Sequence, residues 1–387
     1  MNANGQLSIL APTRYPWSFN GPRKSRHIIN RRSFIPFNKL TNKLEGITIL
    51  NAPPWERRDL IHAFNRIPLN SGPFIIGFES HLPRGFGLET TAYFNWLRGM
   101  LADSRCKRII AISELARRTF IHFHQGHSAF ERLMSKLEVR YPNVALPPLR
   151  PLENSAEKNL PIRIFFVGNH FARKGGCVAV RVAEMALQKG LPVEVTIAST
   201  LELGAATWTD PLRPEFFDPY LKLLDLPNVV FHRGLANDRV HKLLAESDFL
   251  LLTTFSDTFG YSAVEALANG TPVIGTRGGA LPEFLDGETN SILLDLETAE
   301  LGDWRYSAST ERDTPKFEKL FADEVERLAR ETYAALEKIA ADKGTLPRLR
   351  AGARRTAETI FNPDAASDYW DSLYEEVAAK RPAVSAT

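Results

Sequence analysis

The sequence predicts an α/β fold built from two doubly wound domains, and three observations support this prediction. Short, continuous apolar runs recur along the 387 residues, and such runs are typical of strands buried on both faces. Helical patterning follows several of these runs, as expected for parallel sheets with right-handed crossovers. A proline-rich and then polar stretch over residues 142–159 separates two such series.

The apolar runs give the expected strands in chain order. In the first half they are Leu7–Leu10, Ile47–Leu50, Phe74–Phe78 and Arg108–Ile112. In the second half they are Ile162–Val167, Val193–Ala198, Val229–Phe231, Phe249–Leu252, Pro272–Ile274 and Ile292–Leu294. The expected helices are Ser113–Phe123, Gly175–Lys189, Asp238–Ser247, Ser262–Asn269 and further helical stretches within 315–380. The segment Thr200–Pro219 is expected to be a surface loop.

These patterns place one domain at 1–158 and a second at 159–364, with a C-terminal helical segment at 365–387. In doubly wound sheets, ligands bind outside the carboxyl ends of the strands, where the strand order reverses. Two such domains facing each other would form a cleft between them. Functional residues are therefore expected in the loops that follow strands.

Composition excludes several classes of protein. A hydrophobic fraction of 44% is ordinary for a globular chain. Two lone cysteines, Cys106 and Cys177, exclude a disulfide scaffold and a cysteine-rich zinc module. No apolar run approaches the roughly 20 residues of a membrane span, and Met1–Leu10 lacks the pattern of a signal peptide. We therefore expect a cytoplasmic protein.

The small net charge of +3 hides two oppositely charged parts. Residues 1–150 hold 22 Lys and Arg against 9 Asp and Glu, so they carry +13 and the remainder −10. The densest basic cluster, which contains no acidic residue, consists of Arg14, Arg23, Lys24, Arg26, Arg31, Arg32, Lys39 and Lys43. These cations match no nucleic-acid reading motif, so no nucleic acid is expected. They suit an anionic acceptor or peripheral contact with a membrane surface.

Three stretches carry candidate chemistry, and the first spans residues 167–176. It leaves a strand and opens a helix, with Arg173 and Lys174 just before the helix N-terminus. Free amides and the positive helix end favour anions at such a place, and neighbouring cations suit a diphosphate. The alternative is a solvated basic turn. The stretch matches neither the dinucleotide fingerprint nor the Walker loop.

The second stretch spans residues 256–265 and again joins a buried strand to a helix. Asp257 in the loop and Glu265 in the helix are carboxylates that suit sugar or ribose hydroxyls. The alternative for Glu265 is a capping box with Ser262, which would make it structural. The third stretch, residues 269–283, supplies Gly278 and Gly279 in a permissive loop.

Together the second and third stretches resemble the donor-binding region of glycosyltransferase family 4. The resemblance rests on Asp257, on the run 259–261, on 265–274 (EALANGTPVI), and on Gly-Gly, Pro-Glu and Asp-Gly pairs at 278–279, 282–283 and 286–287. It implies two Rossmann-like domains (the GT-B fold), a C-terminal helix that crosses back to the first domain, and retention of configuration. It also implies a nucleotide-sugar donor and no metal or other cofactor.

The resemblance implies roles residue by residue. Glu265 would hold the ribose hydroxyls, and Asp257, where the family usually has Glu, would hold a donor-sugar hydroxyl. The amides of Phe259, Gly260 and Tyr261 would contact the sugar and phosphate, and Gly234 would lie near the base. Lys174 would neutralise the diphosphate. Asn169 stands where the family has Arg, and Arg173 is the candidate replacement for that charge.

The first domain matches the family poorly in detail. Gly21 is a weak counterpart of a glycine loop that touches the diphosphate. His81 follows a buried strand, as a family histidine often does, and would contact the donor sugar or the acceptor hydroxyl. A lone histidine in that place is also commonly structural. Glu79 is a second candidate.

The expected function is transfer of a hexosyl-type sugar from a nucleotide sugar to a glycan or lipid-linked acceptor. Cell-surface polysaccharide or lipopolysaccharide synthesis is the process that the resemblance implies. Two alternatives stay open: a non-catalytic nucleotide-sugar-binding subunit, and another GT-B enzyme such as an epimerase or a phosphorylase.

Overall fold

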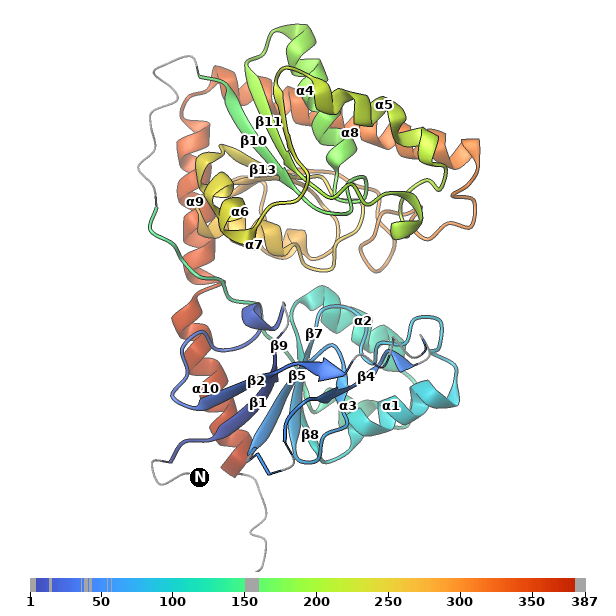
Figure 1. The fold of residues 1–387 in the computed structure, drawn as a ribbon, viewed down its shortest axis with the longest axis vertical. Coiled ribbons are helices and arrows are strands. Elements are labelled where there is room, and N and C mark those ends of the chain that lie inside the picture. The colour runs from blue at the N-terminus through green and yellow to red at the C-terminus, as the bar shows by residue number, and fades with distance from the viewer. Residues whose placement is uncertain are drawn as a thin grey trace, which may run out of the picture. The chain divides into compact units, whose positions relative to one another are not determined.

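The structure is a computed structural model that describes residues 5–13, 16–35, 37, 41, 44–53, 55–56, 58–149 and 160–379. The chain forms two compact units (Figure 1). Unit 1 comprises Met1–Val144 and Phe361–Thr387, and unit 2 comprises Ala145–Ile360. The sequence placed these divisions later, at 158 and 364. Among the contacts of the segment after Val144, the Pro147 carbonyl accepts a hydrogen bond from Arg354 of unit 2, at 2.8 Å.

Unit 2 contains one parallel six-stranded sheet. Its strands are β10 (Ile162–Val167), β11 (Val193–Ala198), β12 (Val229–His232), β13 (Phe249–Leu252), β14 (Val273–Thr276) and β15 (Ser291–Leu294). They lie in the order β12-β11-β10-β13-β14-β15, all parallel. This is the Rossmann order, and it reverses between β10 and β13. All six strands were predicted: three have the predicted bounds, and the ends of the other three differ by one or two residues.

The helices of unit 2 are α4 (Gly176–Lys189), α5 (Asp218–Lys222), α6 (Asn237–Glu246), α7 (Tyr261–Ala268), α8 (Pro315–Ala341) and α9 (Thr345–Thr359). The segment 200–219 is not simply a surface loop. Thr209 and Asp210 are fully buried, and Arg312 donates to the carbonyl oxygen of Asp210 at 2.7 Å. Burial raises the pKa of Asp210. The polar composition of residues 200–219 did not indicate that this segment folds inward and buries Thr209 and Asp210.

Unit 1 contains a second parallel six-stranded sheet. Its strands are β1 (Ser8–Pro12), β2 (Ile28–Arg32), β5 (Leu60–Phe64), β7 (Phe74–Phe78), β8 (Cys106–Ala111) and β9 (Leu137–Val139). They lie in the order β2-β1-β5-β7-β8-β9. A small separate sheet holds β3 (Phe34–Ile35), β4 (Ile47–Leu50) and β6 (Ile67–Pro68). The sequence missed β2, β5 and β9, and it expected β4 among the main strands.

Helices cover both faces of the main sheet of unit 1. They are α1 (Ala92–Ala102), α2 (Glu114–His124), α3 (Phe130–Met134) and α10 (Pro363–Ala379). Ile9 and Leu60 pack with Trp370 of α10, whereas their neighbours Leu10 and Ile61 belong to the cluster that includes α1 and α2. Because both faces are buried, the apolar runs are continuous instead of alternating. The predicted fold class, with its returning C-terminal helix, is confirmed (Figure 1).

Polar contacts join α10 to the main sheet of unit 1 and to the segment before β2. Asp371 accepts hydrogen bonds from the Ser25 hydroxyl and from the Arg26 amide. His62 in the centre of β5 lies 2.7 Å from the Tyr374 hydroxyl through Nδ1. These contacts join segments more than 300 residues apart in the chain.

His62 makes the stability of unit 1 sensitive to acid. Burial lowers its pKa to about 3 from an ordinary 6.5. Between these values the unfolded chain binds more protons than the folded chain, so stability falls as pH drops through that window. We expect His62→Gln to reduce the loss of unfolding free energy between pH 7 and pH 4.5, measured by urea denaturation. The exposed His122→Gln should leave that loss unchanged, and an unchanged loss in His62→Gln would contradict the prediction.

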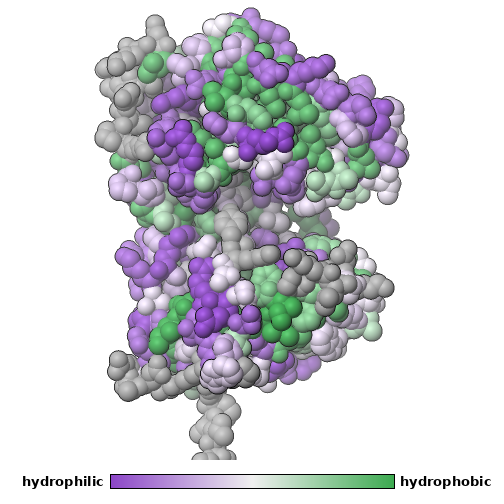
Figure 2. All heavy atoms as spheres, viewed as in Figure 1, coloured by the Kyte–Doolittle hydropathy of each residue, from purple (hydrophilic) through white to green (hydrophobic). Residues whose placement is uncertain are grey.

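Hydrophilic and hydrophobic residues are interspersed over the face of each unit that Figure 2 shows. Within the described part of the chain, none of the helices combines the length and apolar character that crossing a bilayer requires.

Candidate functional site

Two loops of unit 2 meet where the strand order reverses. One follows β10 and spans residues 168–175, and the other follows β13 and spans 253–260. The strands are hydrogen-bonded neighbours, and the loops are joined as well. The Arg173 carbonyl accepts from the Phe255 amide at 2.9 Å and from the Thr254 hydroxyl at 3.1 Å. The two stretches that the sequence singled out therefore form one site, at the position where doubly wound sheets bind ligands.

Lys174 and Asp257 form an ion pair in this site. The second oxygen of Asp257 accepts from the amides of Phe259 at 3.4 Å and of Gly260 at 3.2 Å. Burial alone would raise the pKa of Asp257, but Lys174, Arg173 and these hydrogen bonds outweigh it and hold the pKa below its ordinary value. The carboxylate is therefore charged at neutral pH. It accepts from two of the three amides, those of Phe259 and Gly260, that the resemblance assigned to the sugar and phosphate.

Arg173 is more buried than a solvated basic turn would allow, at 8% exposure. Its guanidinium donates to the Ser256 carbonyl and lies 5.3 Å from the ring centre of Trp208. Its Nε has no hydrogen-bond partner among the described residues. Arg173 thus ties the two loops together, and its predicted contact with a diphosphate stays a prediction.

Two glycines of the site are required by close backbone approach. Gly175 precedes α4 with φ +97°, and a Cβ there would overlap the Thr253 side chain. Gly279 has φ +58°, and a Cβ there would overlap the Asp257 carbonyl oxygen. L side chains rarely adopt such φ values. These glycines let the protein's own loops pack beneath the Lys174–Asp257 pair.

Glu265 lies in α7 and is 7% exposed. The capping-box alternative is wrong, because the helix N-cap is Gly260 with φ +87° and no side chain caps it. Glu265 instead lies with its Oε1 3.7 Å from His241 Nε2 of α6. Sequence reasoning did not single out His241, which no motif marks.

The remaining predicted residues of unit 2 lie at the same sheet edge. Asn169 follows β10 and is exposed. Gly234 follows β12, has φ +77°, and donates to the Ser199 carbonyl at 3.2 Å. Phe259 is fully buried, and Tyr261 packs against it with the rings tilted and their centres 5.5 Å apart.

Known proteins resemble this part of the chain. Residues 161–303 match the family described as "Glycosyl transferases group 1". A D-inositol 3-phosphate glycosyltransferase of Corynebacterium kroppenstedtii is 30% identical over 133 residues, which cover 34% of this chain and 29% of the relative. An N-acetyl-alpha-D-glucosaminyl L-malate synthase of Bacillus anthracis is 36% identical over 97 residues, 25% of this chain and 24% of that protein. The chain thus spans less than a third of each relative's length.

Solved structures match nearly the whole chain in fold. A glycosyltransferase from Rickettsia africae has a TM-score of 0.61 at 14% identity, covering 97% of this chain and all of that one. HepE of Anabaena in complex with UDP and glucose has a TM-score of 0.59 at 13% identity, covering 96% and 100%. At these identities the matches show the fold, and that fold is GT-B.

Two of the residues predicted in unit 1, Gly21 and His81, pack against aromatic rings of the same unit. Gly21 is buried beside Trp17, because a Cβ there would lie 2.7 Å from the indole. His81 packs between the rings of Phe86 and Phe123, with ring centres 4.7 and 4.6 Å away. Burial lowers the pKa of His81, so its imidazole is neutral at pH 7. Its buried Nδ1 has no hydrogen-bond partner among the described residues.

Four of the five described residues of the basic cluster bond to other parts of unit 1. Arg23 donates to Asn143 at 2.7 Å, Arg26 pairs with Glu375, Arg31 donates to the Thr13 carbonyl and Arg32 pairs with Glu56. Arg14, Lys39 and Lys43 lie outside the described residues. Lys24 is exposed. The formal charge of +13 therefore overstates the positive charge that is available to a ligand.

Within the ranges that the structure describes, there is no group of three or more His, Cys, Asp or Glu side chains placed to hold a metal ion.

Proposed function

We propose that this protein transfers a hexosyl-type sugar from a nucleoside-diphosphate sugar to a glycan or lipid-linked acceptor. One observation carries the proposal: Lys174, at the N-terminal side of α4, lies at the strand-order reversal of a group 1 glycosyl transferase region. Retention of configuration, action without a metal, and a role in cell-surface polysaccharide or lipopolysaccharide synthesis belong to the proposal. So do a cytoplasmic location and peripheral membrane contact through the basic half.

The reaction needs stabilisation of a leaving group. The bond between the anomeric carbon and the diphosphate oxygen breaks, and the nucleoside diphosphate leaves with the electron pair. A bond forms from the acceptor oxygen to the anomeric carbon, and the acceptor hydroxyl gives up its proton. Preorganised cations and amides contribute most where such charge develops. Lys174 is held by Asp257 at that position, so the donor diphosphate would exchange one anionic partner of the ammonium for another.

Glu265→Gln tests the ribose assignment. Because a carboxylate binds neutral hydroxyls more strongly than an amide does, we expect the dissociation constant for the nucleotide to rise about tenfold. This corresponds to about 1.4 kcal/mol. Isothermal titration with UDP, GDP and ADP measures it, each as the free nucleotide and as its sugar conjugate. The melting temperature should change little, because Glu265 caps no helix.

The panel also separates the competing functions. Glu246→Gln on the neighbouring α6 is the matched control, since Glu246 pairs with Lys242 on the surface. Unchanged nucleotide affinity in Glu265→Gln would contradict the ribose role. Nucleotide-sugar binding without transfer to any acceptor glycan would replace the transferase by a binding protein. Conversion of the donor sugar to its epimer would replace it by an epimerase.

A further inference from the structure

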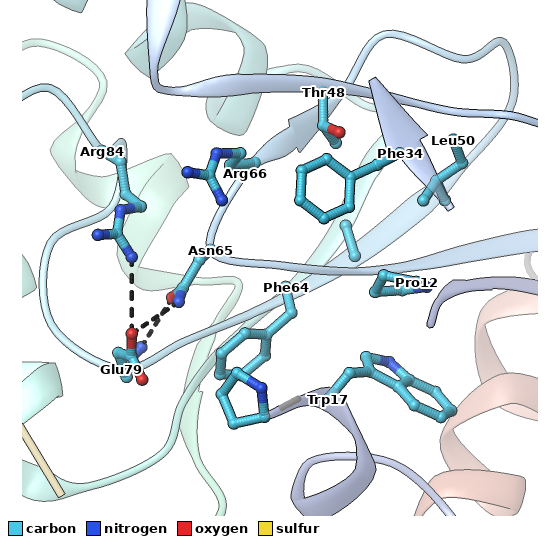
Figure 3. Close-up of a pocket in the computed structure, with 12 residues that line it drawn as sticks. Pro12, Trp17, Phe34, Thr48, Leu50, Phe64, Asn65, Arg66, Glu79 and Arg84 are labelled. Atoms are coloured by element: carbon cyan, nitrogen blue, oxygen red, sulfur yellow. Dashed lines mark hydrogen bonds and ion pairs between the residues drawn. The ribbon is translucent and has the colours of Figure 1, made fainter. Parts of the chain in front are cut away.

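A partly open pocket lies in unit 1, outside the site described above. It has a volume of about 210 Å³, of the order of one hexose ring. It lies at the carboxyl ends of β1 and β5, where the strand order of this sheet reverses. Figure 3 shows the rings of Phe34, Phe64 and Trp17 on one side, and Asn65, Glu79 and the two arginines on the other. One wall is thus aromatic and the other is polar.

The polar wall is a connected and charge-balanced array. Asn65 donates to Glu79 at 2.9 Å, and Arg84 lies 3.5 Å from the same carboxylate. Arg66 and Arg84 both pair with Glu45, at 3.4 and 3.2 Å. Two guanidinium groups therefore face two carboxylates. Such an array offers donors and acceptors side by side, which suits neighbouring hydroxyls that both donate and accept.

Two buried polar atoms that line the pocket lack partners. The hydroxyl of Thr48, a residue 5% exposed, has no hydrogen-bond partner among the described residues, and the indole N–H of Trp17, 3% exposed, has none either. A buried polar group without a partner is costly, typically by about 1–3 kcal/mol. Both atoms belong to side chains that line the pocket, although the atoms themselves are buried.

The geometry points to a binding site for one uncharged pyranose ring in this pocket. The axial C–H groups of the ring would lie on the aromatic wall, whose π faces carry partial negative charge. The hydroxyls would bond to the Asn65–Glu79 array and to Thr48. If the protein is the proposed transferase, this ring is the sugar at the end of the acceptor. The identity of the acceptor as a sugar rests on that proposed function, whereas the binding site does not.

The same contacts disfavour an anionic ligand. An anion entering beside Arg66 or Arg84 would have to displace Glu45 or Glu79 from its ion pair, or lie next to these carboxylates. The sequence expectation of an anionic acceptor came from the formal charge of the first half. In this pocket that charge is already balanced.

Thr48→Val tests the site, because it removes the hydroxyl and keeps the shape. The matched control is Thr332→Val in unit 2, which also removes a buried hydroxyl that lacks a partner within the described ranges. The probes are the methyl glycosides of glucose, mannose and galactose, compared with glucuronate. Saturation-transfer NMR and titration with the full chain measure binding. We expect at least one neutral glycoside to bind, with a dissociation constant at least fivefold higher in Thr48→Val and unchanged in Thr332→Val.

The outcomes separate this site from the donor site. Binding of UDP or another nucleotide should be the same in Thr48→Val and in the wild type. Tighter binding of glucuronate than of any neutral glycoside, or equal glycoside binding by both threonine variants, would overturn the proposal. If the wild-type protein binds the glycosides but binds no nucleotide, the proposed function is overturned and the pyranose site is not.

Discussion

Lys174→Ala is expected to slow transfer by about 10²- to 10³-fold, the loss typical when one preorganised donor to a developing anion is removed. The ammonium lies at the strand-order reversal beside the N-terminus of α4, where charge on a departing diphosphate would develop. The rate is measured with a radiolabelled nucleotide sugar, once the panel above has identified the donor. Unchanged turnover would refute the leaving-group role of Lys174.

Lys174→Ala should also lower stability, because it leaves the Asp257 carboxylate buried without its closest cation. Breaking one partner out of a buried pair typically costs about 3–5 kcal/mol. The variant Lys174→Ala/Asp257→Ala removes both charges, so we expect it to regain much of the melting temperature and none of the rate. This contrast separates chemistry from folding.

Lys242→Ala is the matched control for this prediction. Lys242 also pairs with a carboxylate, Glu246 at 3.9 Å, but on the exposed surface of α6. Both its transfer rate and its melting temperature should match the wild type, since exposed pairs contribute about 0–1 kcal/mol. If Lys242→Ala lost as much transfer rate as Lys174→Ala, the rate would depend on the overall charge of the protein and not on the cation at position 174.

The strands of unit 2 could be predicted from sequence because each is a continuous apolar run followed by a glycine or polar loop. The strand order could not, since no local pattern tells which strands pair. The pairing places residues 83 apart, Lys174 and Asp257, in one ion pair. Arg173 shows the same limit, because only the packed loop reveals that its guanidinium points at the protein's own carbonyl.

In unit 1 the sequence signals were weaker for a physical reason. The central strand β5 carries His62, whose imidazole Nδ1 lies 2.7 Å from the hydroxyl of Tyr374 from the far end of the chain. The edge strand β2 reads IINRR, with arginines that bond to neighbouring segments. The formal charge of residues 1–150 includes those arginines as if they were free to bind a ligand. Their partners, among them Glu375 of α10 for the nearby Arg26, are visible only after folding.

Gly279→Ala is expected to cost both stability and transfer. The φ of +58° is unfavourable for alanine by about 1–2 kcal/mol, and the new methyl group would overlap the carbonyl oxygen of Asp257. Backbone atoms cannot move aside as a flexible side chain can. The Asp257 loop must therefore shift, which disturbs the Lys174 pair and the Phe259 amide together. We expect at least a tenfold loss of transfer rate, with a fall in melting temperature.

Gly190→Ala isolates the contact from the backbone strain. Gly190 ends α4 in the same unit with φ +73°, and a Cβ there would meet nothing within 4 Å. Both variants thus bear the strain of a left-handed residue, and only Gly279→Ala adds the collision with Asp257. The fall in melting temperature should be larger in Gly279→Ala, and the loss of transfer should be confined to it. If the two variants lose the same melting temperature and transfer rate, backbone strain alone explains both losses. The Asp257 loop would then tolerate a shift while keeping its ion pair with Lys174.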